Sequence, residues 1–107
     1  MANRAVTIKD KAGTVLAQGS EPEQLLYFEG NWYFDPAQVN MAVLKVTERT
    51  YTCPYKGVCF WVDLQDGATT ARDIGWVYDK PKAGYEQIAG RIAFYNGNRD
   101  STVAEVN

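Results

Sequence analysis

The sequence predicts an all-β domain of seven to nine short strands with one short helix, closing either as two packed antiparallel sheets or as an open barrel. Three observations support this fold class. Short segments of alternating apolar and polar residues recur along the chain. Turn dipeptides such as Asn96-Gly97 separate them. The 107 residues are 46 % hydrophobic and 13 % aromatic, which indicates one ordered domain over residues 1–107.

The first third of the chain is expected to form a meander of short strands. Alternation and β-branched residues predict a strand at 5–9, and further strands are expected at 14–17, 24–29 and 32–34. A turn ending at Gly13 joins the first two strands, and a loop at 18–22 follows the second. Gly30-Asn31 is the signal for a two-residue hairpin turn before the fourth strand.

The single helix is predicted at residues 36–43. Asp35 is a suitable N-cap, and Pro36 suits the first helical position because it lacks a backbone N–H. A short strand at 44–46 is expected to follow, with residues 47–52 leading into the next turn.

The most apolar strand is predicted at residues 58–64. Val58 and Phe60 point to one face and Cys59 and Trp61 to the other. Because both faces carry apolar side chains, we expect a central strand that is buried on both sides. Phe60 is expected to be among its best-packed residues.

The last third of the chain predicts three more strands. We expect them at 74–78, at 90–95 and, as an edge strand, at 102–106. Pro81 ends the first of these, residues 83–88 form a short helical turn or a loop, and Asn96-Gly97 is a hairpin turn.

Composition excludes several classes of function. The net charge is −2 with no basic stripe, so neither nucleic acid nor an anionic membrane is an expected partner. The apolar runs are too short to span a bilayer and the N-terminus does not look like a signal peptide, so a cytoplasmic location is expected. Without histidine, Cys–His and Ser–His–Asp nucleophiles are impossible within one chain. Two cysteines alone make a zinc site improbable, and no metal or cofactor is expected.

The stretch Cys53-Pro54-Tyr55-Lys56-Gly57 is the main candidate site. It places a thiol, a phenol and an ammonium group in one turn, and a nearby Lys56 would lower the pKa of Cys53. The alternatives are a buried structural cysteine, a solvated lysine and a Tyr-Lys strand cap. Glu29 lies in an apolar segment and is either exposed at an edge or directed into a cavity.

Four segments together resemble the family called domain of unknown function 427, a bacterial-type family. They are Trp32-Tyr33-Phe34, Thr52-Cys53-Pro54-Tyr55-Lys56-Gly57, Trp76-Val77-Tyr78 with Pro81, and Ile88-Ala89-Gly90-Arg91-Ile92-Ala93-Phe94-Tyr95. The resemblance covers about residues 6–95. It implies the β-tent topology also known from B-type methionine sulfoxide reductases. The paired Cys-x-x-Cys zinc sites of those enzymes are missing here, so their metal and chemistry do not transfer.

The resemblance also implies a pocket. Its expected residues are Glu29, Tyr33, Cys53, Tyr55, Lys56, Trp76 and Tyr78. The family is sometimes labelled a nucleotidyltransferase, but this chain has no Gly-Ser followed by paired aspartates on a strand, and no phosphate-binding loop. After Tyr95 the chain departs from the proline-containing ending of the family, so residues 96–107 carry no functional expectation.

Three functions follow from these residues. The first is a small-molecule-binding domain, in which Lys56 meets an anionic or carbonyl group, Trp76 and Tyr78 pack on an apolar part, and Glu29 binds a donor. The second is a small enzyme, transferase- or hydrolase-like, with Cys53 or Lys56 as nucleophile. The third is a protein-interaction module. The sequence does not specify the oligomeric state.

Overall fold

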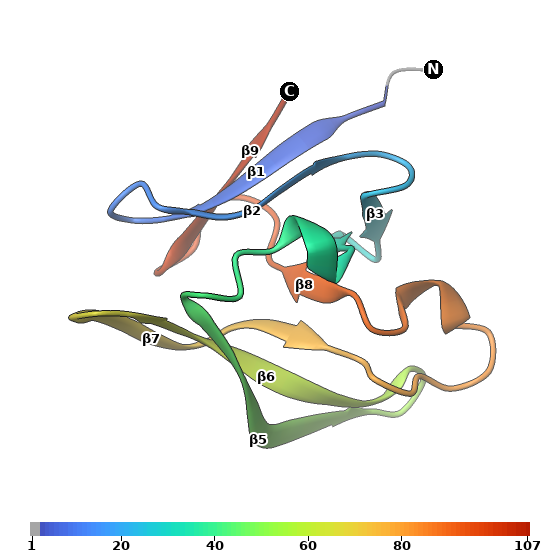
Figure 1. Cartoon of the computed structure of the whole chain (residues 1–107). Helices are drawn as coiled ribbons and strands as arrows, with labels where there is room; N and C mark the ends of the chain where they lie inside the picture. The colour runs from blue at the N-terminus through green and yellow to red at the C-terminus, as the bar shows by residue number, and fades with distance from the viewer. Residues whose placement is uncertain (1–2) are drawn as a thin grey trace.

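The computed structural model describes residues 3–107 and confirms an all-β fold (Figure 1). The strands form two antiparallel sheets that do not close into a barrel. They are β1 (Ala5–Asp10), β2 (Val15–Ser20), β3 (Leu25–Phe28), β4 (Asn31–Phe34), β5 (Leu44–Cys53), β6 (Gly57–Asp66), β7 (Thr69–Val77), β8 (Ile92–Phe94) and β9 (Thr102–Val106). Two short 3-10 helices, η1 (Pro36–Gln38) and η2 (Glu86–Ile88), complete the described elements.

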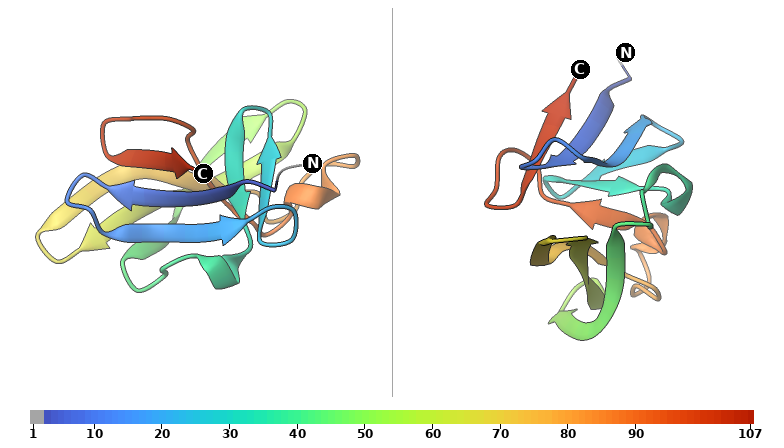
Figure 2. Two further views of the ribbon diagram at one scale, coloured as in Figure 1. Left: turned by 90° about the horizontal axis from the view of Figure 1, so that it is seen from above. Right: turned by 60° about the vertical axis from the view of Figure 1, so that its left-hand side comes forward.

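The two sheets differ in size. The three-stranded sheet has the order β2-β1-β9, and the six-stranded sheet has the order β3-β4-β8-β7-β6-β5. Figure 1 shows β3 and β8 between the small sheet and the β5–β7 part of the large sheet. Since β9 pairs with β1, the first and last strands lie side by side, with the end of β9 next to the start of β1 (Figure 2). The expected edge strand at 102–106 is thus confirmed.

The hairpin between β3 and β4 turns one residue earlier than expected. Both Glu29 (φ 49°) and Gly30 (φ 84°) have positive φ, as the two central residues of a type I′ turn do. Asn31 already belongs to β4. The prediction of Gly30-Asn31 as the turn was therefore wrong, and Glu29 lies in the turn instead of in the strand.

The predicted helix at 36–43 is reduced to one 3-10 turn, η1. The Asp35 carboxylate does cap it by accepting the backbone N–H of Ala37. At Val39 the backbone becomes extended (φ −112°, ψ 136°) and forms a bridge to Ala17 of β2. Pairing with the small sheet therefore ends the helix after one turn.

Several strands are longer than predicted, because their partners extend the pairing. β5 runs over ten residues instead of the expected 44–46, and β6 pairs with it as far as Cys53 and Gly57. β7 begins at Thr69, not at 74, where it pairs with the end of β6. β2 continues to Ser20 against β1, across part of the expected loop at 18–22.

The strand predicted at 58–64 is confirmed within β6, but its burial is uneven. Cys59, Val62 and Leu64 are at most 2 % exposed, whereas Val58 is 43 % exposed and Phe60 is half-buried. Val62 and Leu64 pack in the core shared with the small sheet, and Phe60 lies closer to the β5–β6 turn. The expectation that Phe60 is among the best-packed residues was wrong.

The six-stranded sheet is apolar on both faces. One face packs on the small sheet and forms a core that includes Val6, Ile8, Phe34 and Phe94. The other face carries a second cluster to which no described residue of β1, β2 or β9 contributes. We call this second face the outer face. No helix in residues 3–107 has the length and apolar character needed to cross a membrane.

Candidate functional site

A row of side chains crosses the outer face of the six-stranded sheet. Strand pairing places Leu26 beside Tyr33, Tyr33 beside Ala93, Ala93 beside Trp76, and Trp76 beside Trp61. Ala93 is the smallest member and lies between two large aromatic residues. The row therefore has a gap at its centre, over which the neighbouring rings can meet.

The rings of Trp76 and Tyr33 meet over Ala93. The Trp76 indole Nε1–H donates a hydrogen bond of 3.1 Å to the Tyr33 hydroxyl oxygen. Both residues are buried, with Trp76 7 % and Tyr33 2 % exposed. Burial raises the pKa of Tyr33 above its ordinary value, so this phenol stays neutral and keeps its proton at physiological pH.

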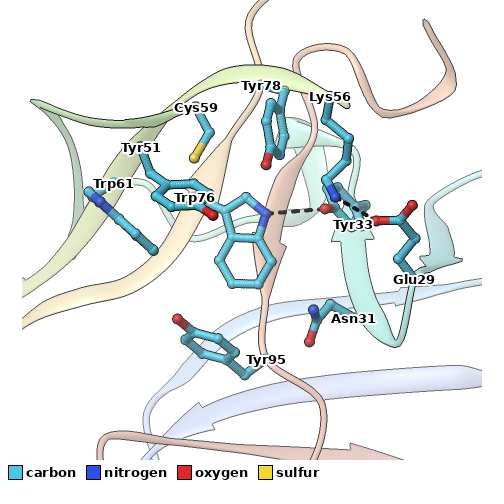
Figure 3. A pocket seen from close by; sticks show the side chains of 10 residues that line it. All are labelled: Glu29, Asn31, Tyr33, Tyr51, Lys56, Cys59, Trp61, Trp76, Tyr78 and Tyr95. Carbon is cyan, nitrogen blue, oxygen red and sulfur yellow. Dashed lines mark hydrogen bonds and ion pairs between the residues drawn. The ribbon is translucent and has the colours of Figure 1, made fainter. Parts of the chain in front are cut away.

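A cavity of about 240 Å³ opens beside these two residues (Figure 3). Its lining combines six aromatic side chains with a small number of polar ones. The lining residues are Glu29, Asn31, Tyr33, Tyr51, Lys56, Cys59, Trp61, Trp76, Tyr78 and Tyr95. They come from β4, β5, β6 and β7, from the turns before β4 and β6, and from the segments after β7 and β8.

Three rings form walls at steep angles to one another. The ring centroids of Trp61 and Trp76 are 6.3 Å apart with an interplanar angle of 76°. Those of Trp76 and Tyr95 are 4.8 Å apart at 60°. The Trp76 ring thus contacts the rings of both Trp61 and Tyr95, and we call these three residues the aromatic box.

The polar end of the cavity is an ion pair between two turns. Lys56 Nζ in the β5–β6 turn lies 2.5 Å from Glu29 Oε1 in the β3–β4 turn (Figure 3). The Lys56 side chain is only 16 % exposed, and that of Glu29 is 47 % exposed. Burial, the largest single effect, lowers the pKa of Lys56, but the hydrogen bond to Glu29 and the nearby negative charges together outweigh it, so the net shift of the pKa is upward. The lysine therefore remains an ammonium group.

The Cys53–Gly57 turn is held by backbone contacts. Gly57 has φ +105°, a conformation that L side chains rarely adopt, and it pairs with Cys53 at the base of the turn. The Lys82 backbone N–H donates to the Lys56 carbonyl at 2.8 Å, and Lys82 Nζ donates to the Pro54 carbonyl at 3.0 Å. These contacts fix the backbone from which the Lys56 side chain extends.

The two thiols have opposite environments. The Lys56 backbone N–H donates to Cys53 Sγ at 3.4 Å, and this bond, more than the ammonium group, lowers the pKa of Cys53. Burial raises the pKa of Cys59, which is 1 % exposed. Burial also raises the pKa of the neighbouring Tyr78. The cavity thus contains the protonated thiol, and the more acidic one lies outside its lining.

Labelling with a small thiol reagent should therefore distinguish the cysteines. We expect Cys53 to react faster than Cys59 at neutral pH. The pH at which Cys53 reaches half of its maximal rate should lie below the ordinary thiol pKa of about 8.5. Cys53→Ser and Cys59→Ser variants, each with one thiol left, give the two pH profiles. Lys56→Ala should preserve most of the Cys53 reactivity because the backbone N–H remains. Equal profiles, or a higher midpoint for Cys53 than for Cys59, would contradict this assignment.

The structure brings together most of the residues expected to form a pocket. Glu29, Tyr33, Lys56, Trp76 and Tyr78 all line the cavity. Cys53 belongs to the apolar cluster beneath it but is not part of the lining. Tyr55 is 73 % exposed and does not face the cavity. The hypothesis that Cys53, Tyr55, Lys56 and Glu29 share one cavity thus holds for Lys56 and Glu29 alone.

Sequence reasoning did not assign five lining residues to the pocket. They are Asn31, Tyr51, Cys59, Trp61 and Tyr95. The alternation of β6 already placed Cys59 and Trp61 on one face, so that signal was present. Tyr51 lies opposite Cys59 in the β5–β6 ladder, and finding it required the register. Asn31 and Tyr95 reach the cavity through the β4–β8 pairing, for which the sequence holds no local signal.

A comparison with known protein families shows to which family the chain belongs. Residues 2–105 match the family described as "Domain of unknown function (DUF427)". The chain belongs to this family. A comparison with curated proteins gave no match. In residues 3–107 of this DUF427 protein, no group of three or more His, Cys, Asp or Glu side chains is placed to hold a metal ion.

Proposed function

We propose that this DUF427 protein is a small-molecule-binding domain whose ligand occupies the cavity on the outer face. The lining carries the proposal, because six aromatic side chains and an ion pair surround about 240 Å³. Aromatic side chains combined with a few placed polar groups are typical of ligand sites. The volume is below the range of about 300–1,000 Å³ typical of ligand pockets, which suits a molecule with a single ring.

An enzyme that uses these residues as nucleophiles has less support. Cys53 does not line the cavity, and Lys56 is paired with Glu29. Cys59 does line it, but its raised pKa disfavours the thiolate, which is the reactive form.

A protein-interaction module is the third alternative. Tyr55 and Val58 are exposed near the β5–β6 turn, which favours such a role. Scattered exposed apolar residues are normal on soluble proteins, so this observation is weaker than a lined cavity.

The three tryptophans provide a direct test by NMR. Trp61 and Trp76 line the cavity, whereas Trp32 packs in the core between the sheets and donates its indole N–H to Asn96 Oδ1 at 2.9 Å. Titration with benzamide, a single-ring compound, should shift the indole N–H signals of Trp61 and Trp76 and leave that of Trp32 in place.

Two matched aromatic variants complete the test. Trp61→Ala should weaken binding at least about tenfold, or about 1.4 kcal/mol. Tyr55→Ala should have no effect, because this tyrosine is exposed outside the cavity. Indole signals that move with neither benzamide nor its charged analogues benzoate and benzamidine, or equal losses of binding in the two variants, would count against the proposal.

A further inference from the structure

The polar end of the cavity indicates which chemical group the ligand carries. Lys56 offers N–H donors and Glu29 offers carboxylate acceptors, and the two atoms Nζ and Oε1 lie 2.5 Å apart. We infer that the ligand is a neutral single-ring molecule with an amide-like edge, in which a hydrogen-bond acceptor lies beside a donor. This inference rests on the proposed binding function and specifies its ligand class.

The spacing of the ion pair matches an amide. With a C=O bond of about 1.23 Å and a C–N bond of about 1.33 Å, the O and N atoms of one amide lie about 2.2 Å apart. The amide oxygen can accept from the Lys56 ammonium while the amide N–H donates to the Glu29 carboxylate. Hydrogen bonds to ionised partners are stronger than those between neutral groups. Lys56 and Glu29 would therefore bind the amide group of the ligand through two strong hydrogen bonds.

The charges of the pair favour a neutral ligand. A carboxylate on the ligand would meet the Lys56 ammonium but would be repelled by Glu29 beside it. A cationic group would meet Glu29 but would be repelled by Lys56. The two residues together carry no net charge, so a neutral group that uses both avoids either repulsion.

The Tyr33 hydroxyl adds an independent indication of an acceptor on the ligand. This residue is 2 % exposed and lines the cavity, and its oxygen accepts the Trp76 indole N–H. Because the oxygen is the acceptor in that bond, the hydroxyl proton of Tyr33 can be donated to a ligand in the cavity. A carbonyl oxygen of the ligand would accept this proton.

The aromatic box fixes the rest of the ligand. The rings of Trp61 and Tyr95 each pack against the ring of Trp76, at interplanar angles of 76° and 60°. A flat ring placed in such a box contacts one wall by its face and another by its edge, the two arrangements that aromatic pairs prefer. The volume of about 240 Å³ leaves room for one ring and its polar edge.

Three probes of equal size test the inference. Benzamide presents an acceptor beside a donor and is neutral, benzoate is an anion, and benzamidine is a cation. Each is titrated against the full chain, with the indole N–H signals of Trp61 and Trp76 as the readout. We expect benzamide to bind at least about tenfold more tightly than either charged probe.

Two variants should change the selectivity in opposite directions. Glu29→Gln removes the negative charge and should raise the affinity for benzoate at least fivefold. Lys56→Met removes the positive charge and should raise the affinity for benzamidine at least fivefold, and Lys56→Gln, which keeps a polar side chain, should act in the same direction. Glu23→Gln and Lys80→Met change exposed charges outside the cavity lining and should leave all three affinities unchanged.

The outcomes separate this inference from the proposed function. If benzoate or benzamidine binds as tightly as benzamide at Trp61 and Trp76, or if the variants leave the selectivity unchanged, the amide assignment is overturned and the binding function stands. If none of the three probes moves these signals, both are overturned. The expected ranking together with the opposite changes in the two variants supports both.

Discussion

Replacing Phe94 with alanine should lower the free energy of unfolding by about 3–5 kcal/mol. Phe94 is 0 % exposed and lies in the core between the two sheets. Its ring packs edge-on against Phe34, with centroids 5.9 Å apart at 75°. The substitution removes this contact and leaves a cavity that the paired strands cannot close. Urea denaturation of wild type and variant measures the loss.

Phe60→Ala is the matched comparison. Both residues are phenylalanines in the six-stranded sheet on the face toward the small sheet, but Phe60 is only half-buried. Phe60 buries less apolar surface on folding than Phe94, and its removal leaves no closed cavity. We therefore expect the free energy of unfolding to fall by about 1–2 kcal/mol. Equal losses of unfolding free energy in the two variants would contradict the partial exposure of Phe60 near the β5–β6 turn.

Replacing Gly75 with alanine should destabilise the protein by about 3 kcal/mol, which is the upper part of the usual range for overpacking. A Cβ atom at this position would lie 2.5 Å from the carbonyl oxygen of Ala93. The contact is with backbone, so no side-chain rotation can relieve it. β7 and β8 pair through only three residues each, and moving them apart would weaken the whole ladder.

Gly19→Ala provides a graded control for this effect. Its Cβ would lie 3.0 Å from Gln24 Cβ, in an exposed residue just before β3 that can move. We expect a loss of about 1 kcal/mol. Melting curves of the two variants should therefore differ clearly. If Gly75→Ala lowered the stability no more than Gly19→Ala, this would contradict the close approach of β8 to Gly75 of β7.

Local sequence patterns were sufficient for the fold class and for much of the strand content. The alternation in the segments that became β1 and β6, and the short apolar runs that became β4 and β8, are properties of a few consecutive residues, so they can be recognised without knowing the partner strands. The same holds for the turn at Gly57, whose positive φ suits glycine. The helix at 36–43 failed because Val39 pairs with Ala17, a contact that no local pattern encodes.

The candidate site was only partly predictable, because local patterns identify single residues but not the contacts between distant ones. Lys56 stood out because it shares one turn with a thiol and a phenol, and Glu29 stood out as a carboxylate in an apolar segment. Their pairing, however, depends on two turns that meet in space. Tyr55 shares the turn of Lys56 but points to solvent, which the spacing along the chain could not reveal.

The sequence by itself determined which residues alternate, and therefore which side chains share one face of a strand. Only the tertiary structure decided which strands are neighbours. In the order β4-β8-β7-β6, the neighbours β4 and β8 are far apart in the chain. That order places Ala93 between Tyr33 and Trp76 and so opens the gap beside which the cavity lies. A cavity is a property of several strands in register, and its walls are set by the pairing of strands that contact one another only after folding.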